Sequence, residues 1–214
     1  LMADLSQVQT VAFNCEGGLV LNRSTFMMKP GEALELQNFE PDIEGGYRRI
    51  NGFSKYVSAV VPQTSSSAEK VLMVATFASK VVAARGTNIF TADAGGSSWT
   101  ERDTGRTSAG KYSFERYNFD GNEKIIVVDG ANAPTIFNSS LSATDVSESS
   151  VAGSTIVVAF KSHMFYAGKS STPQTLVFSE PFDEDGFNSG DGAGTIKVDD
   201  NIVGLKVFRD SLFI

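Results

Sequence analysis

The sequence predicts an all-β protein made of β-propeller-type blades, each a four-stranded antiparallel sheet. One sequence motif occurs four times: a phenylalanine, then a short polar turn, then an apolar run. It begins at Phe77, Phe119, Phe160 and Phe208. The apolar runs are rich in Val, Ile and Phe and are joined by short polar stretches, which is typical of β-hairpins. Hairpins that recur about every 40–50 residues are typical of propeller blades.

The blades follow one another along the chain. We expect the first over residues 71–102 and the second over residues 111–141, and the third begins at Thr155. The third carries a long polar insertion, residues 183–192, and the fourth has only begun at Ile214. The repeated phrase places hairpin turns at 78–80, 120–123, 161–163 and 209–211.

The N-terminal part of the chain differs from the blades. Residues 1–61 form an extended leader with Gly-rich turns, and residues 70–214 form about three complete blades and the beginning of a fourth. A polar linker at 62–69 joins the two parts. Phe213-Ile214 is an apolar strand without a following turn, and an unpaired apolar edge is unfavourable. We therefore expect the chain to be part of a longer protein.

Composition excludes several classes of function. The formal net charge is −7 and the isoelectric point is near 4.8, which argues against a broad nucleic-acid footprint. One cysteine, Cys15, excludes an intramolecular disulfide and a Cys-based zinc site. No apolar run is long enough for a membrane-spanning helix, and the N-terminus lacks a signal-peptide pattern, so we expect synthesis in a cytoplasm.

Few residues suggest chemistry. His163 is the single histidine and falls in the predicted turn of the third hairpin, where other repeats have Lys80, Lys124 and Ser211. We interpret it as a polar turn position, since the chain offers no Ser-His-Asp or Cys-His set.

Two groups of carboxylates were also considered. Oxygen-bearing side chains in the insertion suit a hard cation such as Ca²⁺, but their spacing departs from an EF-hand, so a solvated loop is preferred. These side chains are Asp183, Asp185, Asn188 and Asp191. The alternating Glu40, Asp42 and Glu44 share a strand face, as a glycosidase pair could, yet nothing distinguishes them from a solvated stripe. The sequence thus predicts no catalytic residue, no cofactor and no metal site.

Several phrases resemble those of virion and tail structural proteins of tailed bacteriophages. They include Gly17-Gly18-Leu19, Pro30-Gly-Glu-Ala33, Gly45-Gly-Tyr-Arg-Arg-Ile-Asn-Gly-Phe53, Asn118-Phe-Asp-Gly121 and Leu176-Val-Phe-Ser-Glu-Pro-Phe182. In these motifs the chain is similar to the propeller-bearing nozzle and tail-stabilising proteins of short-tailed phages. The motifs are turns and strand ends, and the resemblance covers most of residues 17–214.

This resemblance implies a non-enzymatic structural component of the tail, such as a nozzle, hub or tail-accessory protein. Its partners would be other virion structural proteins and copies of itself in a homo-oligomeric ring, and its location would be the virion. The alternative is a carbohydrate-binding or carbohydrate-cleaving β-propeller. One Trp and five Tyr are few for sugar stacking, which favours the first hypothesis.

The leader is the predicted interaction surface. Its short extended pieces bury little apolar area alone, and such segments gain order by adding to another sheet edge. Large apolar side chains at the centre of an interface carry most of its energy. The expected anchors are Phe39, Ile43, Tyr47, Ile50 and Phe53.

Overall fold

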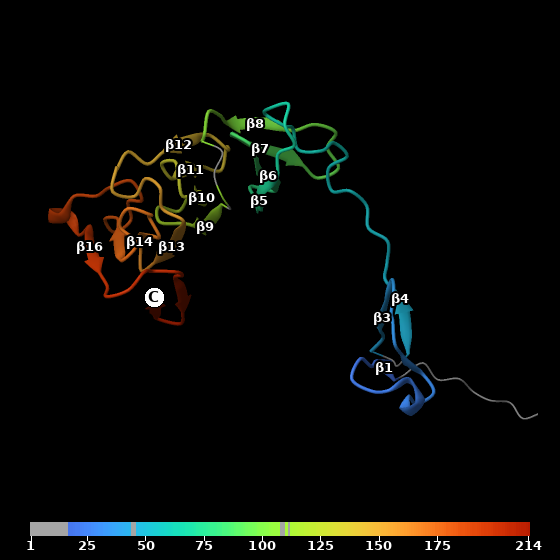
Figure 1. The fold of residues 1–214 in the computed structure, drawn as a ribbon. Coiled ribbons are helices and arrows are strands. Elements are labelled where there is room, and N and C mark those ends of the chain that lie inside the picture. Colours follow the sequence, from blue (N-terminus) through green and yellow to red (C-terminus); the bar gives the residue numbers. More distant parts are fainter. Residues whose placement is uncertain (1–16, 44–45, 108–109, 111) are drawn as a thin grey trace, which may run out of the picture. The chain divides into compact units, whose positions relative to one another are not determined.

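The computed structural model describes residues 17–43, 46–107, 110 and 112–214. The chain divides into two compact units, Leu1–Ser54 and Lys55–Ile214. They are called unit 1 and unit 2 below, and each is described by itself (Figure 1). No helix among the described residues has the length and apolar character needed to cross a membrane.

Unit 2 contains three four-stranded antiparallel sheets and one further hairpin. Blade 1 comprises β5 (Val71–Phe77), β6 (Lys80–Arg85), β7 (Asn88–Asp93) and β8 (Thr100–Asp103). Blade 2 comprises β9 (Ser113–Tyr117), β10 (Lys124–Val128), β11 (Thr135–Phe137) and β12 (Ala143–Asp145). Blade 3 comprises β13 (Ile156–Phe160), β14 (His163–Ala167), β15 (Thr175–Phe178) and β16 (Gly194–Lys197), and β17 (Lys206–Phe208) pairs with β18 (Ser211–Phe213). In each sheet the strands lie in chain order, so the all-β, blade-type prediction is confirmed.

The four predicted hairpins are present, and three of them have two-residue turns. Phe77 pairs with Lys80, Phe160 with His163 and Phe208 with Ser211. Both turn residues of the first hairpin, Ala78 and Ser79, have positive φ, as the type I′ turn requires in order to match the twist of the strands. The β9–β10 hairpin has the longer connection 118–123.

Blade 2 is buried on both faces by its neighbours. Within β10, Ile125 and Val127 belong to the apolar cluster shared with blade 1, whereas Ile126 and Val128 belong to the cluster shared with blade 3. Successive side chains of a strand point to opposite faces, so one strand contributes to both clusters. This double burial explains why the strand is continuously apolar instead of alternating.

A third apolar cluster joins blade 3 to the last hairpin. Ala167 and Leu176 of blade 3 pack with Ile202, and Leu205 and Leu212 pack against them. The first strands of successive blades, β9 and β13, also lie next to each other. The sheets therefore stack face to face in chain order, which is the arrangement of propeller-type blades.

The segment before the first blade contacts blade 1 at several points. The backbone N–H of Gly95 donates to the carbonyl of Tyr56, and the N–H of Ser58 donates to the carbonyl of Gly96. The Trp99 indole donates to the carbonyl of Ala59 at 3.0 Å. Residues 56–61, which the sequence assigned to the leader, thus belong to unit 2.

Unit 1 contains only short elements. The strands β1 (Gly18–Leu19) and β2 (Glu32–Ala33) are parallel, η2 (Thr25–Met27) is a single 3₁₀ turn, and β3 (Phe39–Pro41) pairs antiparallel with β4 (Tyr47–Arg49). The Tyr47 hydroxyl donates to the carbonyl of Gly31 at 3.2 Å. This bond links the hairpin to the segment that leads into β2.

Candidate functional site

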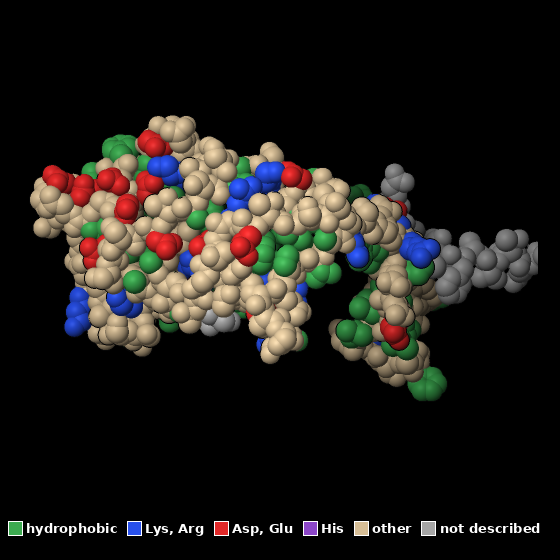
Figure 2. Space-filling view, turned by 90° about the horizontal axis from the view of Figure 1, so that it is seen from above, with side chains coloured by type: hydrophobic (Ala, Val, Ile, Leu, Met, Phe, Trp, Pro, Cys, Tyr) green, Lys and Arg blue, Asp and Glu red, His purple; other side chains and the backbone are tan. Residues whose placement is uncertain are grey.

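Apolar side chains of unit 1 lie at its surface. Within residues 17–43 and 46–54, no large apolar side chain is buried. The exposed ones are Leu19, Leu21, Phe26, Met27, Leu34, Phe39, Ile43, Ile50 and Phe53. Figure 2 shows apolar side chains on the outside of this unit. Exposed apolar surface of this density is typical of interaction sites.

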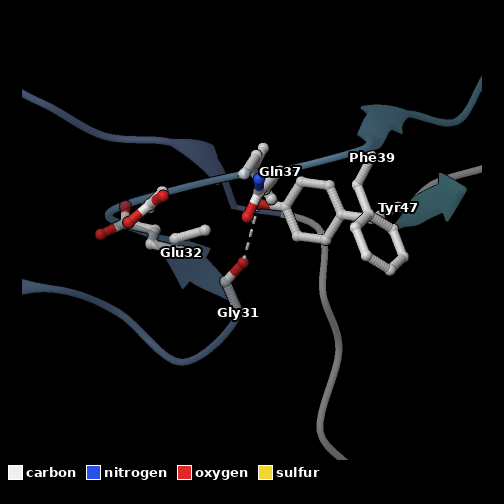
Figure 3. A pocket seen from close by; sticks show the side chains of 8 residues that line it. Gly31, Glu32, Gln37, Phe39 and Tyr47 are labelled. Carbon is white, nitrogen blue, oxygen red and sulfur yellow. Dashed lines mark hydrogen bonds between the residues drawn. The ribbon is translucent and has the colours of Figure 1, made fainter. Parts of the chain in front are cut away.

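One groove of about 500 Å³ lies between β2 and the β3–β4 hairpin. Its apolar wall is formed by Ala33, Leu36 and the rings of Phe39 and Tyr47, which lie beside each other (Figure 3). Phe39 and Tyr47 lie on the same face of the hairpin. Tyr47 pairs with Pro41, which lies two residues after Phe39, and side chains two residues apart on a strand point to the same side.

Polar side chains also line this groove. Glu32, Glu35 and Gln37 line it. The Arg23 guanidinium donates to Glu32 at 3.1 Å, and the backbone N–H of Lys29 donates to the same carboxylate at 2.9 Å. The groove can therefore offer an aromatic wall and a polar rim to a partner.

A second hollow follows β4 and is lined by Asn38 and residues 49–53. Ile50 is 49% exposed and Phe53 is 98% exposed, so both side chains are available for contact. The predicted anchors thus divide into two places: Phe39 and Tyr47 in the first groove, and Ile50 and Phe53 at this second hollow. Ile43, fully exposed, lines neither.

His163 has a structural role in blade 3. It is the first residue of β14 instead of a turn residue, and its Nδ1 lies 2.6 Å from the carbonyl oxygen of Ser179. Because a carbonyl only accepts, Nδ1 carries the proton. The ring also meets Phe178 edge-on with centroids 5.7 Å apart. The histidine therefore joins β14 to the chain that follows β15.

The acidic insertion is exposed over most of its length, as expected for a solvated loop, but a few of its residues contact the blades. Glu184 is buried and accepts from the Lys124 ammonium of blade 2 at 2.7 Å. Asp185 accepts from the backbone N–H of Ser147 at 2.9 Å. Phe187 packs on Tyr166, with ring centroids 5.9 Å apart. The insertion is therefore held to the blades by both ionic and apolar contacts.

The oxygen-bearing side chains of the insertion use their oxygens locally. Asp183 accepts from the N–H of Asp185, and the Asn188 side-chain oxygen accepts from the N–H of Gly190. Asn188 also donates to Asp191 at 2.5 Å. Among the described residues, no group of three or more His, Cys, Asp or Glu side chains is arranged to hold a metal ion.

The carboxylate stripe of the leader is only partly described. Glu40 accepts from Arg48 at 2.7 Å across the β3–β4 pair, as expected for oppositely charged side chains on directly paired residues. Glu44 lies outside the described residues. What the structure describes of this stripe is a surface ion pair.

The sequence analysis missed a buried arginine between blades 1 and 2. The guanidinium of Arg106 donates through Nη2 to Asp129 at 2.9 Å and through Nη1 to Asp103 at 2.9 Å. Nη1 also donates to the hydroxyl of Thr135, and the guanidinium lies 5.6 Å from the ring centroid of Tyr112. Asp103 ends β8 of blade 1, while the other partners flank or belong to blade 2.

The charges of this cluster stabilise one another. Burial disfavours the charge of Arg106, but hydrogen bonds and attraction from Asp103 and Asp129 raise its pKa above the ordinary value. Burial would raise the pKa of Asp129, yet backbone N–H donors of Asn132 and Ala131, together with Arg106, lower it. The pair is therefore ionised and fastens the two blades together.

No sequence signal pointed to this cluster. Arg106 lies in the connection between two blades, and Asp129-Gly130 reads simply as a turn. Contact between these positions depends on how the sheets stack, which local patterns do not encode.

Comparisons with known proteins give distant similarity in structure. No family model and no curated protein matches the chain. Two crystal structures of BBS1N in complex with ARL6DN, one soaked with lead and one with mercury, are similar to it at 10% and 11% identity, with TM-scores of 0.44 and 0.42. The similarity covers 74% of this chain and 49% and 48% of those chains, so the chain spans about half their length. The fold assignment rests on the blades themselves.

Proposed function

We propose that the chain is a non-enzymatic structural component of a tailed-phage virion, in the tail as a nozzle, hub or tail-accessory protein. It acts by assembly with neighbouring virion proteins and with copies of itself in a ring. The virion assignment comes from the sequence motifs that resemble phage tail proteins, and the exposed apolar surface of unit 1 supports the assembly role.

The observation that carries this proposal is the apolar surface of unit 1. Phe53 and Ile43 are almost fully exposed, and Phe39 and Ile50 are about half exposed. Leaving a large apolar side chain in water forgoes about 1.5–3 kcal/mol that burial would supply. Several such side chains on one small unit therefore favour a protein partner that covers them.

The blades supply the rigid body that such an assembly protein needs. Blade 2 is buried on both faces, and the buried charges of Arg106 and Asp129 are paired with each other. This buried ion pair joins blade 1 to blade 2.

The carbohydrate alternative receives less support from the aromatic residues. Sugars stack on exposed aromatic faces, but Tyr112, Tyr117 and Tyr166 are buried. Trp99 is half-buried, and its indole N–H is bonded to Ala59. In the part of the chain that the structure describes, these three tyrosines lie in the apolar clusters between the sheets.

Mass spectrometry of purified phage particles tests the virion assignment. We expect the chain in particles at a fixed copy number, and cryo-electron microscopy should place it in the tail. Its absence from washed particles that contain all other tail proteins would contradict the proposal.

The role of unit 1 is tested by a chain that lacks residues 1–54. We expect this protein to keep the folded blades, as circular dichroism would report, but to be lost from particles. The matched control is the full chain with Glu40→Gln and Arg48→Gln, which removes an exposed ion pair and leaves the apolar side chains. Normal incorporation of the truncated chain would show that unit 1 is not the assembly surface.

A further inference from the structure

Asn51 and Gly52 form the one Asn-Gly pair in the sequence, and they follow the β3–β4 hairpin of unit 1. The N–H of Ile50 donates to the carbonyl of Asn38 at 3.0 Å, which closes this hairpin. Residues 51–55 belong to no helix or strand, and both members of the pair are exposed to solvent. The pair therefore lies in an open stretch of chain.

The contacts of the described residues leave this pair free to change conformation. Within that part of the chain, no hydrogen bond involves the Asn51 side chain or the Gly52 N–H. A Cβ added at Gly52 would meet no atom within 4 Å, so the backbone has room to rotate. Glycine also has the widest choice of φ and ψ. The Gly52 nitrogen can therefore reach the side-chain carbonyl carbon, Cγ, of Asn51.

Two Asn-Ser pairs of unit 2 are held in place and provide comparisons within the same chain. The side-chain oxygen of Asn138 accepts from two backbone N–H groups, both at 3.0 Å. The side-chain oxygen of Asn188 accepts from a backbone N–H at 3.0 Å, and its amide donates to Asp191 at 2.5 Å. These bonds fix both side chains, and a serine after the asparagine adds a Cβ that restricts the backbone. The structure thus sets Asn51 apart from these two asparagines.

We propose that Asn51 is a site of spontaneous deamidation. The backbone nitrogen of Gly52 loses its proton and attacks Cγ of Asn51, forming a new C–N bond. The bond from Cγ to the side-chain nitrogen breaks, and this nitrogen takes up a proton from solvent and leaves as ammonia. Water then opens the resulting succinimide ring. Attack at one carbonyl gives aspartate, and attack at the other gives isoaspartate, so the reaction consumes one water and needs no oxidant or reductant.

Deamidation changes the charge and the backbone of the second hollow of unit 1. The hollow is lined by Asn38 and residues 49–53, among which Arg49 is the only charged side chain. A carboxylate at position 51 offsets this positive charge. Isoaspartate also adds one carbon to the backbone between Ile50 and Phe53, two of the predicted anchors. Loss of assembly on ageing follows only if unit 1 is the assembly surface, as proposed above, whereas the modification itself does not depend on that role.

Mass spectrometry of the full chain tests the modification. The protein is incubated in warm, mildly alkaline buffer, which favours loss of the amide proton, and is then digested with trypsin. Cleavage after Arg49 and Lys55 releases residues 50–55, in which Asn51 is the only asparagine. We expect conversion of amide to acid at Asn51 at least tenfold faster than at Asn138 or Asn188, with isoaspartate among the products. Equal rates at the three asparagines would overturn the proposal.

Two controls separate the chemistry of the pair from its setting in the fold. Gly52→Ala adds a Cβ that restricts the backbone, so conversion at Asn51 should slow at least tenfold. A synthetic peptide with the sequence of residues 47–56 gives the rate of the pair outside the fold, and the folded chain should react within a factor of a few of it. Conversion of Gly52→Ala as fast as that of the native chain, or a folded chain at least tenfold slower than the peptide, would contradict the proposal.

The consequence for assembly is tested separately in particles. Asn51→Asp carries the charge of the product from the start, whereas Asn51→Gln keeps a neutral amide on a longer side chain. We expect Asn51→Asp to be incorporated at least threefold less than Asn51→Gln. Equal incorporation of the two variants would show that the change at position 51 does not affect assembly. Because the mass measurement uses the free chain, absence of the chain from particles would contradict the virion assignment and leave the measured deamidation standing.

Discussion

The blades of unit 2 and the short strands of unit 1 are both β-structure, but they use their apolar residues in opposite ways. In the blades, Ile125, Ile126 and Val127 are fully buried between neighbouring sheets. In unit 1, Phe53 and Ile43 are exposed, although Asp42 beside Ile43 donates its backbone N–H to the carbonyl of Gly46. An isolated two-stranded hairpin is at best marginally stable in water.

This difference teaches that hydrogen-bond ladders alone do not make a stable core. The blades gain stability because the sheets pack face to face, with blade 2 covered on two faces, and a buried ion pair fixes adjacent sheets. Unit 1 has apolar side chains but no opposing layer within its described residues, so its surface suits a partner. Under the proposed function, unit 2 provides stability and unit 1 provides the interaction surface.

We expect the largest change in unfolding free energy when a buried phenylalanine of a blade, and not an exposed phenylalanine of unit 1, is replaced. Phe137 has no exposed area, so Phe137→Ala should lower the free energy of unfolding by about 3–5 kcal/mol. Phe53→Ala, its matched control, should change it by less than about 0.5 kcal/mol because the ring is in water. Urea unfolding followed by circular dichroism measures both. Similar losses for the two variants would remove the distinction between the units.

The buried ion pair between the blades should behave differently from surface pairs. Arg106→Met leaves Asp129 buried without its guanidinium partner and should cost about 3–5 kcal/mol of unfolding free energy. Arg116→Met breaks the exposed pair with Glu123 and should cost less than about 1 kcal/mol. Adding Asp129→Asn to Arg106→Met should recover part of the loss. A variant Arg106→Met as stable as the native chain would show that the cluster does not fasten the blades.

The acidic insertion gives a smaller effect of the same kind. Phe187→Ala removes a half-buried ring from Tyr166 and should cost about 1–2 kcal/mol, less than for a fully buried ring. The exposed Phe182 in the same region is the control, and Phe182→Ala should be nearly neutral. Thermal unfolding of both variants provides the measurement. Equal melting temperatures would show that Phe187 does not anchor the insertion to blade 3.

Acid should weaken the contact between the blades by protonating Asp129. Its folded-state pKa is lowered, so its contribution to stability is complete above the unfolded pKa of about 3.9 and is lost as the pH falls through the folded value. Asp129→Asn should therefore be less stable at pH 6, and its stability should fall less steeply below about pH 4. Asp93→Asn, at an exposed carboxylate, should follow the native chain. Parallel pH profiles for the native chain and Asp129→Asn would exclude this role.

The sequence predicted the blade architecture because local patterns encode hairpins. The repeat from Phe77 to Phe208 located all four hairpins, but three of the predicted turns extended one residue into the following strand, β6, β14 or β18. The sequence could not predict that Arg106 meets Asp129, because that contact depends on the stacking of separate sheets. The anchoring of the insertion could not be predicted for the same reason: Glu184 reads as a surface residue until Lys124 of another blade lies beside it.

The leader anchors were chosen from residue type, and the structure separates them into two hollows and one free side chain. Phe39 and Tyr47 could be paired only when the register of β3 and β4 was known. Their role in binding stays a prediction, since exposure by itself does not name the partner.

Hydrogen exchange of the free full-length chain tests the central claim most directly, because it reports the stability of each strand separately. We predict slow exchange for the amides of β6, β10 and β14 that approaches the rate of global unfolding. The amides of β1–β2 and β3–β4 should exchange at least a hundredfold faster, because no buried apolar layer supports them. If unit 1 were protected as strongly as the blades in the absence of any partner, the division between a stable body and an interaction unit would be wrong.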